Sequence, residues 1–277
     1  MLEESLKHLK EYGLQCDLHG TKGPHEAESA VQKAVHSQSY HAVVAAGGDG
    51  TINEVANGLL GTDLPLGIIP LGTVNVLAKE LGYSLEPDQA ARSIAFGPTQ
   101  AVHVGNANGR AFLLMVGAGF DGRAVAGVSP TLKRSFGQAA YMIAGLKELF
   151  FKRPAKLVVD IDGSRYQTSW VVISNSCFYG GKYLLAAETG LQSRGFEVSL
   201  VAGETRWALV RSLMEMALSR KTKPGWKQIA PVNRITVTAS QDEPVQMDGD
   251  NFAVLPLTVT PAESPLQVIM PFSSVNP

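Results

Sequence analysis

Apolar positions in the first third of the chain follow two alternating spacings. Leu2, Leu6 and Leu9 recur at helical spacing among charged residues, whereas residues 41–46 form a continuous apolar run of the kind found in strands buried on both faces. The helical spacing predicts helices over residues 2–12, 26–39, 51–60 and 74–81. The apolar runs predict strands over residues 14–19, 41–46 and 66–70. Buried strands that alternate with helices indicate a parallel sheet.

The pattern changes near residue 98, where short β-rich runs separated by turn residues begin. These runs predict strands over residues 101–105, 111–117, 156–161, 168–174, 196–202, 233–239 and 252–260. Two helices are predicted among them, over residues 132–151 and 205–219. Many short strands of this kind are typical of a β-sandwich. We therefore expect an α/β domain over residues 1–98 and a β-sandwich domain over residues 99–277.

Composition and charge narrow the function classes. The 277 residues are 45% hydrophobic and 18% charged, as in a folded globular protein. Twenty-four Lys and Arg balance 25 Asp and Glu, which argues against a dedicated nucleic-acid binder. The two cysteines form no disulfide framework, the acidic start does not resemble a signal peptide, and no run of 18 apolar residues occurs. These features predict a cytoplasmic protein, with any membrane contact apolar or transient.

The strongest chemical signal is the turn Gly47-Gly-Asp-Gly-Thr51 after the predicted strand 41–46. Glycines let backbone amides approach an anion, and the N-terminus of the following helix adds partial positive charge. Asp49 would repel phosphate there unless Mg²⁺ or water lies between them. The turn is either a nucleotide–metal site or a chain reversal in which Asp49 caps the helix. Thr51 and Glu54 also have the spacing of a capping box.

A second copy of part of this turn favours the nucleotide site. Gly50-Thr-Ile-Asn53 and Gly72-Thr-Val-Asn75 each open a predicted helix after a predicted strand. In a parallel sheet both helix N-termini lie at the carboxyl edge of the strands, where ligands usually bind. Two such ends can surround one nucleotide.

Two further motifs are weak when taken alone. Residues 117–122 match the G-x-G-x-x-G pattern of dinucleotide sites, but no acidic residue follows at the required distance, so an ordinary turn is favoured, with Asp121 left as a candidate cleft residue. Met247-Asp-Gly-Asp250 reads as an ordinary turn. The P-loop pattern does not occur in the sequence.

Together, several segments resemble the catalytic domain shared by diacylglycerol kinases, sphingosine kinases and their bacterial lipid-kinase relatives. The segments that carry this resemblance, in the family's order, are residues 46–60, 70–82, 117–125, 133–147, 174–181 and 247–250. The resemblance implies a Rossmann-like parallel-sheet domain, a β-sandwich domain and an active site between them. It also implies ATP and Mg²⁺ as cofactors.

The resemblance assigns roles residue by residue. Nucleotide binding falls to Gly47, Gly48, Asp49, Gly50, Thr51, Ile52, Asn53, Glu54, Gly72, Thr73 and Asn75, with Thr21 as an outer contact. Asp49 would lie near the Mg²⁺ on the phosphates. The family's acidic turn is Asp-Gly-Glu, and here it reads Asp248-Gly-Asp250. One of these carboxylates would take the proton from the lipid hydroxyl; Asp248 is favoured and Asp250 is the alternative.

Three departures from the family pattern stand out. The first strand and Asn-Pro-x-x-Gly loop of the family are not in this sequence, so either the sequence is incomplete at its N-terminus or ATP binding is impaired. Loss of that strand is expected to expose apolar surface on its neighbours. Arg194 stands where many relatives have a metal-binding Asp, so no metal is expected there, and Val76 stands where Asp often follows the Asn.

The first functional hypothesis is an ATP-dependent kinase acting on a diacylglycerol-like or sphingoid lipid at a membrane surface. The second is a soluble-substrate kinase of the NAD-kinase type. The third is a lipid- or nucleotide-binding protein without catalysis, which the departures make credible. No nucleic-acid partner is expected, and a homodimer is left open.

Overall fold

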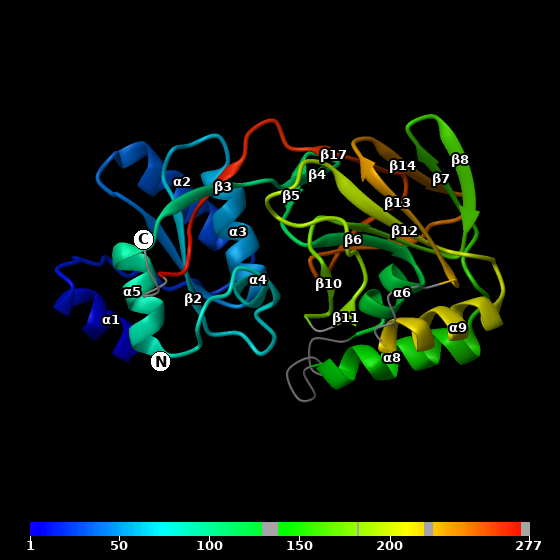
Figure 1. The fold of residues 1–277 in the computed structure, drawn as a ribbon, viewed down its shortest axis with the longest axis horizontal. Coiled ribbons are helices and arrows are strands. Elements are labelled where there is room, and N and C mark those ends of the chain that lie inside the picture. Colours follow the sequence, from blue (N-terminus) through cyan, green and yellow to red (C-terminus); the bar gives the residue numbers. More distant parts are fainter. Residues whose placement is uncertain (129–137, 182, 219–223, 273–277) are drawn as a thin grey trace. The chain divides into compact units, whose positions relative to one another are not determined.

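The computed structural model describes residues 1–128, 138–181, 183–218 and 224–272. The chain divides into two compact units (Figure 1). Unit 1 comprises residues 1–103 and the segment from residue 263 onward, and unit 2 comprises residues 104–262. The predicted division at residue 98 therefore differs from the observed one, because the C-terminal segment, which had been assigned to the sandwich, returns to unit 1.

Unit 1 contains most of the helices and strands predicted for the first third of the chain. Its helices are α1 (Leu2–Glu11), α2 (Glu26–Ser37), α3 (Asp49–Leu59), α4 (Val76–Glu80) and α5 (Pro87–Phe96). Its strands are β1 (Val43–Gly47), β2 (Leu66–Pro70), β3 (Thr99–Val102) and β18 (Leu266–Ile269). The structure confirms the four predicted helices to within a few residues at each end. The helical spacing analysis missed α5, which begins at a proline in its first turn.

The sheet of unit 1 has four strands in the order β1-β2-β18-β3. β1 and β18 each pair in parallel with β2, whereas β3 pairs antiparallel with β18. The parallel pairing predicted for the two apolar strands is confirmed. β18 was not predicted, and it explains the changed boundary, because its pairing with β2 joins the end of the chain to unit 1.

The strand predicted over residues 14–19 is wrong. Residues 14–22 have no regular structure and are exposed, including Leu18. A strand needs a neighbour for its backbone hydrogen bonds, and within the described residues the outer edge of β1 carries no strand. For the same reason β1 is only half-buried, with Ala45 as its one buried residue, whereas β2 is buried throughout as predicted.

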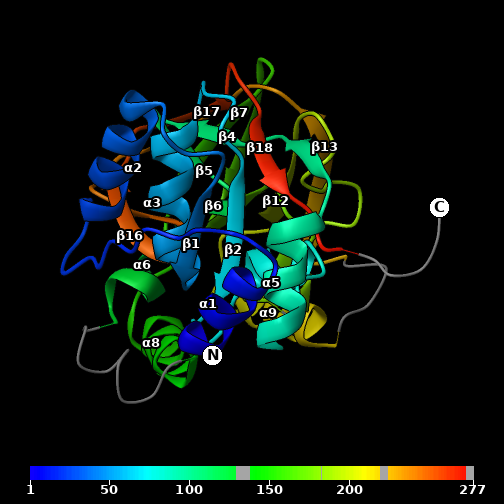
Figure 2. The same cartoon turned by 90° about the vertical axis from the view of Figure 1, so that its left-hand side faces the viewer.

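Helices flank the strands of unit 1, as Figure 2 shows. α1 and α5 contact each other and pack on the sheet, where Leu9, Ala91 and Ile69 are buried together. α2 packs against α3, and Gly58 permits this contact, since a Cβ at that position would lie 2.8 Å from the Cβ of Val31. The apolar faces read from the sequence are the faces that form this core.

Unit 2 is built from two six-stranded antiparallel sheets and a short hairpin. One sheet has the order β13-β12-β9-β6-β15-β16, with strands Trp226–Val232, Phe196–Val201, Trp170–Ser174, Met115–Gly119, Pro244–Met247 and Asp250–Val254. The other has the order β5-β4-β17-β14-β7-β8, with strands Arg110–Phe112, Gly105–Ala107, Leu257–Pro261, Ile235–Ala239, Leu157–Ile161 and Ser164–Thr168. The hairpin joins β10 (Phe178–Tyr179) and β11 (Tyr183–Leu184).

Apolar residues from the two sheets form one core, so the β-sandwich prediction is confirmed. Phe112 and Phe196, from opposite sheets, stack with ring centroids 5.6 Å apart. Two predicted strands are each split: residues 111–117 span β5 and β6, and residues 252–260 span β16 and β17. In both cases the chain crosses from one sheet to the other, which a continuous apolar run conceals.

Three helices complete the described part of unit 2. They are α6 (Phe120–Ala126), α8 (Gln138–Phe151) and α9 (Arg206–Ala217). α8 and α9 confirm two predicted helices, although residues 132–137 and 219 of those predictions lie outside the described residues. None of the helices in the described ranges is both long enough and apolar enough to cross a bilayer.

Candidate functional site

The two glycine turns of unit 1 touch each other. A Cβ built on Gly72 would lie 2.6 Å from the Cα of Gly48, so this approach requires a glycine at position 72. The backbone N–H of Leu71 also donates to the carbonyl oxygen of Gly47 at 3.0 Å. The residues just before the first Gly-Thr-x-Asn copy thus touch the start of the second copy, and we call the two turns the glycine corners (residues 47–51 and 71–75).

Asp49 joins the two corners. Its Oδ2 accepts a hydrogen bond from the backbone N–H of Val76, and its Oδ1 accepts one from Leu77, both at 3.1 Å. Asp49 therefore caps α4 rather than its own helix. The predicted capping box is wrong, because α3 begins at Asp49, two residues before Thr51, and Gly48 precedes it without a side-chain cap.

The N-terminus of α3 presents hydrogen-bond donors. The first backbone N–H groups of a helix have no partner inside the helix, and the helix dipole adds partial positive charge. In α3 these groups belong to Asp49, Gly50 and Thr51, and Gly50 is exposed. The side chain of Thr51 packs directly on Gly47: a Cβ built on Gly47 would lie 2.7 Å from the Cβ of Thr51. This end of α3 suits a phosphate group.

Asn75 adds an acceptor to the same corner. It adopts a left-handed backbone conformation with φ 51° and donates from Nδ2 to the carbonyl oxygen of Gly72 at 2.8 Å. Its Oδ1 is buried and accepts no hydrogen bond within the described part of the protein. A buried acceptor without a partner is costly, so this atom suits a donor from a bound water or ligand.

Other residues of the predicted nucleotide set have different surroundings. Ile52 is fully buried in the core of unit 1. Glu54 accepts a hydrogen bond at Oε2 from the backbone N–H of Ala27, at the start of α2. Asn53 accepts hydrogen bonds from Nδ2 of Asn57. These three side chains stabilise α3 and its neighbours, and their predicted role in nucleotide binding gains no support from these contacts.

Thr73 and Thr21 are both exposed. Thr73 belongs to the second glycine corner, where its side chain is accessible to a ligand. Thr21 lies in the irregular segment 14–22 and not at the end of a strand, as its predicted role required. Its part as an outer contact stays a prediction.

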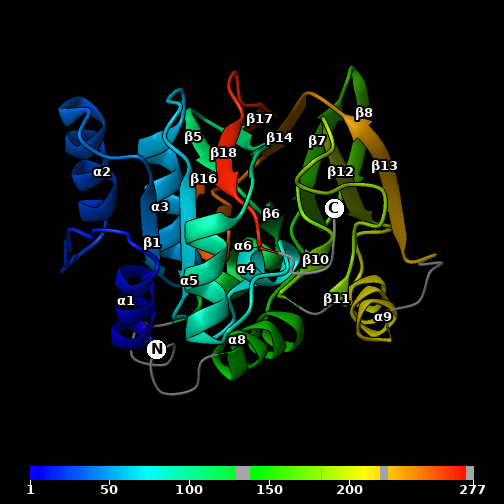
Figure 3. The same cartoon turned by 60° about the vertical axis from the view of Figure 1, so that its left-hand side comes forward.

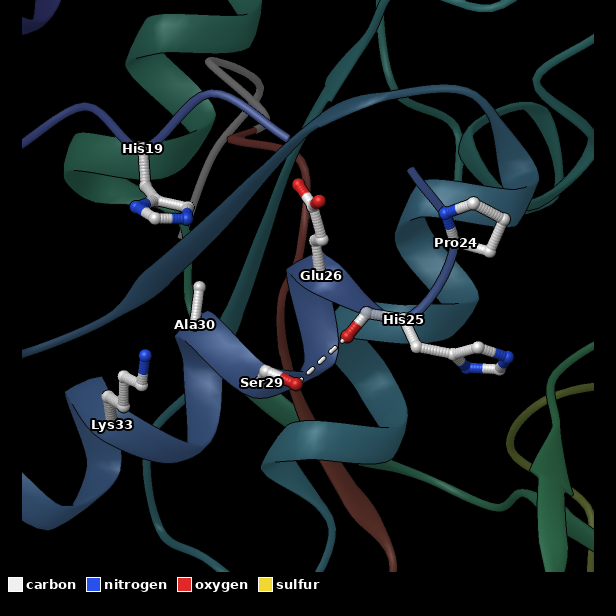
Figure 4. A pocket seen from close by; sticks show the side chains of 7 residues that line it. All are labelled: His19, Pro24, His25, Glu26, Ser29, Ala30 and Lys33. Carbon is white, nitrogen blue, oxygen red and sulfur yellow. Dashed lines mark hydrogen bonds between the residues drawn. The ribbon is translucent and has the colours of Figure 1, made fainter. Parts of the chain in front are cut away.

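A separate hollow of about 310 Å³ lies beside the first half of α2 (Figure 4). Its lining residues are His19, Pro24, His25, Glu26, Ser29, Ala30 and Lys33. In the close view Ser29 donates to the carbonyl oxygen of His25, at 3.1 Å. None of the predicted nucleotide residues lines this hollow, so it is distinct from the glycine corners.

In unit 2 the acidic turn after β15 contains one structural and one exposed carboxylate. Asp248 accepts the backbone N–H of Leu113 at Oδ2 and those of Leu114 and Met115 at Oδ1, at 2.8–3.0 Å. Its own backbone N–H donates to the carbonyl oxygen of Met115 at 2.9 Å. Hydrogen bonds to a carboxylate stabilise its charged form and oppose its protonation. These contacts show a structural role for Asp248, and its part as the base stays a prediction.

Asp250 is exposed at the start of β16 and pairs in register with Met247. A single residue, Gly249, stands between it and Asp248, and its φ of 88° forms the tight turn. The geometry favours Asp250, the alternative in the sequence prediction, as the carboxylate that can reach a ligand.

A buried hydrogen-bond network around Asp121 reaches this acidic turn. Asp121, in the first turn of α6, accepts one hydrogen bond from the hydroxyl of Tyr179 at 2.5 Å and one from Nε2 of Gln246 at 2.8 Å. Gln246 in turn accepts the backbone N–H of Gly249 at 2.9 Å. Burial raises the pKa of Asp121 to about 6, against the opposing effect of its two hydrogen bonds. Burial beside that carboxylate also raises the pKa of Tyr179 well above its usual value.

This network is the part of unit 2 that the sequence analysis missed. The motif 117–122 was interpreted as a turn, but β6 runs to Gly119 and α6 begins directly after it. Asp121 is buried, not placed on a cleft surface. Gly117 was a sequence signal for this network, because its lack of a Cβ leaves room for the Asp121 carboxylate. The sequence alone could not show that this carboxylate is the group that occupies the space.

Comparisons with known proteins agree along the chain. A family model described as "Diacylglycerol kinase catalytic domain" matches residues 1–107. A second, described as "YegS C-terminal NAD kinase beta sandwich-like domain", matches residues 114–270. The first match covers the N-terminal part of unit 1, and the second covers most of unit 2 together with β18, which belongs to unit 1.

Individual relatives cover almost the whole sequence. A diacylglycerol kinase of Bacillus subtilis (strain 168) is 30% identical over 278 residues, covering 98% of this chain and 90% of that protein. A diacylglycerol kinase of Staphylococcus aureus (strain Newman) is 26% identical over 284 residues, with coverage of 99% and 88%. A crystal structure of a diacylglycerol kinase from Bacillus anthracis str. Sterne superimposes with a TM-score of 0.78 at 20% identity, covering 97% of this chain and 90% of that one, which shows a shared fold.

Proposed function

We propose that this chain, which belongs to the diacylglycerol kinase catalytic-domain family, transfers the γ-phosphate of ATP to a hydroxyl group of a lipid. Family membership agrees with the resemblance drawn from the sequence motifs. Two relatives are named as diacylglycerol kinases, which supports a diacylglycerol-like acceptor over a sphingoid one.

The single observation that carries the proposal is the contact between the two glycine corners. Gly72 lies so close to Gly48 that it cannot carry a side chain, and a Cβ on Gly48 would lie only 3.3 Å from the Cα of Gly72. The open N-terminus of α3 lies at this contact. Backbone amides and a helix N-terminus bind phosphate in many proteins. The buried Oδ1 of Asn75 offers an acceptor for a donor on the ligand. Together, the backbone amides, the N-terminus of α3 and the Oδ1 of Asn75 fit the binding of a nucleoside triphosphate.

Mg²⁺ fits this site only if phosphate oxygens of the nucleotide supply part of its coordination shell. Among residues 1–128, 138–181, 183–218 and 224–272, no three His, Cys, Asp or Glu side chains are grouped to bind one metal ion. Both oxygens of Asp49 already accept backbone N–H groups. Mg²⁺ commonly takes only one or two carboxylates and completes its shell with phosphate oxygens and water. When bound, it would neutralise phosphate charge beside Asp49.

Asp250 is our choice for the general base. In the proposed step its carboxylate accepts the proton of the lipid hydroxyl, the hydroxyl oxygen forms a bond to the γ-phosphorus, and the bond to the β–γ bridging oxygen breaks to release ADP. Asp248 instead holds the turn through three backbone amides. Positioning and charge neutralisation dominate phosphoryl transfer, and a general base adds to them.

The test is transfer of label from γ-labelled ATP in detergent micelles. Parallel reactions contain diacylglycerol, sphingosine or NAD, and the products are divided between organic and aqueous phases. Label in the organic phase with diacylglycerol is the expected result. Label only with NAD would replace the proposal with a soluble-substrate kinase. Nucleotide binding without any transfer would leave a binding protein and refute the kinase proposal.

A further inference from the structure

The glycine-rich motif of residues 117–122 joins β6 to α6. Figures 1 and 3 show α6 next to β6, and α6 also packs against β15, the strand that leads into the acidic turn. Two glycines of the motif make this packing possible. A Cβ built on Gly117 would overlap Oδ2 of Asp121, and a Cβ built on Gly122 would overlap the carbonyl oxygen of Pro244. The motif therefore lets α6 approach β6 and β15 more closely than side chains would allow.

Two side-chain contacts tie α6 to β15. Gln246 donates a hydrogen bond from Nε2 to Oδ2 of Asp121 at 2.8 Å. Arg123, two positions further along α6, donates from Nε to Oε2 of Glu243 at 2.6 Å and from Nη2 to Oε1 of the same residue. Gln246, Asp121 and Glu243 are all buried. These contacts hold β15 against α6 just before its first residue and near its end.

β15 and β16 form a hairpin with a two-residue turn, Asp248-Gly249, after which Asp250 begins β16. Both turn residues have positive φ, 51° and 88°, as in the tight turns that suit hairpins. The register of the two strands shifts between Val245 and Gln246. Irregularities of this kind change the direction of a strand and of the side chains that follow. The first residues of β16 therefore depend on how the chain is held near Gln246.

The side-chain amide of Gln246 connects α6 to the turn. Its Nε2 donates to Asp121, and its Oε1 accepts the backbone N–H of Gly249 at 2.9 Å. Asp121 is held in turn by the hydroxyl of Tyr179, which donates to Oδ1 at 2.5 Å. A continuous series of hydrogen bonds thus runs from Tyr179 through Asp121 and Gln246 to the residue that immediately precedes Asp250.

Gln246 and Asp248 hold different residues of the turn. Asp248 is fixed by the backbone N–H groups of residues 113–115. Gly249 is the residue with the greatest backbone freedom, because glycine has no Cβ. The contact with Gln246 restricts this residue, and the direction in which the chain enters β16 at Asp250 follows from it.

We propose that Gln246 is a positioning residue that sets the orientation of Asp250 for proton transfer. This inference rests on the proposed kinase function, in which Asp250 accepts the proton of the lipid hydroxyl. A general base acts only within hydrogen-bond reach of that proton, and a small displacement of a reacting group lowers the rate strongly. Loss of the two Gln246 contacts therefore lowers turnover and leaves nucleotide binding at the glycine corners unchanged.

The first test is Gln246→Met, which keeps the length of the side chain and removes both hydrogen bonds. Its kcat for label transfer to micellar diacylglycerol should fall about 10–10²-fold, with an unchanged KM for ATP. The matched control is Gln228→Met. Gln228, on the opposite edge strand β13 of the same sheet, donates from Nε2 to Oε1 of the buried Glu197 at 2.6 Å. Equal losses of kcat in both variants would mean that the whole sheet loosens, and would overturn the inference.

A reversal of polarity provides a second, independent test. Gln246→Glu alone places a second carboxylate against Asp121 and should lower kcat, because like charges repel. Adding Asp121→Asn should restore kcat to near the unchanged value: the new amide at position 121 donates to the new carboxylate at position 246, which still accepts the N–H of Gly249. A double variant with kcat as low as that of Gln246→Glu would contradict the positioning role. This pair also replaces Gln246→Met if that variant fails to fold by circular dichroism.

Amide hydrogen exchange separates this inference from the proposed function. In Gln246→Met the N–H of Gly249 should exchange about tenfold faster, whereas the N–H groups of residues 113–115, which Asp248 holds, should keep their protection. Unchanged kcat in Gln246→Met would overturn the positioning role and leave the kinase proposal intact. Absence of transfer by the unchanged protein would refute the kinase proposal, and exchange at Gly249 would then decide by itself whether Gln246 orders the turn before Asp250.

Discussion

Units 1 and 2 each use an aspartate in a glycine-containing turn to hold backbone amides from a distant segment. In unit 1, Asp49 accepts the N–H groups of Val76 and Leu77, 27 and 28 positions further on. In unit 2, Asp248 accepts the N–H groups of residues 113–115, between 133 and 135 positions earlier. Both motif aspartates thus join two segments of their own unit, and neither of these long-range contacts was predicted from the sequence.

The two turns differ in what they leave accessible. The turn in unit 1 leaves the first backbone N–H groups of α3 accessible, and these are donors at the positive end of a helix dipole. The turn in unit 2 leaves Asp250, an exposed carboxylate. Backbone N–H donors can bind an anion, and an exposed carboxylate can accept a proton. In each turn, therefore, the group accessible to a ligand belongs to a neighbour of the motif aspartate (Asp49 or Asp248) and not to that aspartate itself.

The largest expected effect comes from removing the exposed carboxylate. Asp250→Asn keeps the size of the side chain but cannot accept the proton, so kcat should fall about 10²–10⁴-fold. Affinity for ATP and resistance to urea should stay unchanged. The measurement is label transfer to diacylglycerol in micelles, with Asp242→Asn, an exposed acid ahead of β15, as the matched control. Near-normal kcat in Asp250→Asn would remove it as the base.

Asp248→Asn should instead affect stability. An amide oxygen cannot replace a carboxylate toward three backbone donors, and the loss of one or two charge-assisted hydrogen bonds should lower the free energy of unfolding by about 3 kcal/mol. The left-handed backbone at Asp248, φ 51°, is also tolerated by Asn, so strain does not confound the result. Urea unfolding followed by fluorescence of the buried Trp170 measures the change. A variant as stable as the unchanged protein would show that these bonds contribute little.

The sequence predicted unit 1 better than unit 2 because its elements are local. The helices from α1 to α4 and the parallel pair β1–β2 follow from apolar spacing within about a dozen residues each. The repeated motif predicted that the two helix N-termini lie at one edge of the sheet, but not that Gly48, outside the repeat, would contact Gly72. Failures began where a distant partner decides the structure. Residues 14–19 have a strand pattern but no neighbouring strand within the described residues, and β18 forms by pairing with β2 and β3, which lie well over a hundred positions earlier.

The candidate site shows the same limit. The sequence located the acidic turn and favoured Asp248 over Asp250 as the base, but it could not show that residues 113–115 donate three backbone hydrogen bonds to Asp248. Asp49 was left between a metal ligand and a cap of its own helix, and the structure adds a third role, the cap of α4. The partners of Asp121 also come from distant strands. Long-range contacts of this kind have no signature in local spacing.

A third aspartate sharpens the comparison through pH. Asp121 receives hydrogen bonds from two side chains and none of the backbone support that Asp248 has, and burial raises its pKa to about 6. The unfolded value is near 4. Because the folded state holds this proton more tightly, its contribution to stability is full below about pH 4 and is lost as pH rises through about 6.

The variant Asp121→Asn removes this titration. The stability of the unchanged protein relative to Asp121→Asn should therefore decrease between about pH 4 and pH 7, by up to about 3 kcal/mol. Urea unfolding of both proteins at several pH values measures the difference, in which the titration of other carboxylates cancels. A difference that does not change with pH would mean that Asp121 titrates alike in the folded and unfolded states.

The smallest expected effect tests whether Asp49 and Asp248 have the same role. Asp49→Asn leaves an amide oxygen for one of its two backbone donors, so it should cost about one charge-assisted hydrogen bond, or about 1.5 kcal/mol. Because all three tryptophans lie in unit 2, hydrogen exchange of the Val76 and Leu77 amides is the better measurement. Their exchange should accelerate about tenfold, a smaller change than that of residues 113–115 in Asp248→Asn. Glu80→Gln, on the same short helix but outside this contact, is the control. If Asp49→Asn left exchange at residues 76 and 77 unchanged, the cap would be energetically unimportant, and the carboxylate of unit 1 would be held in its turn for the ligand rather than for the fold.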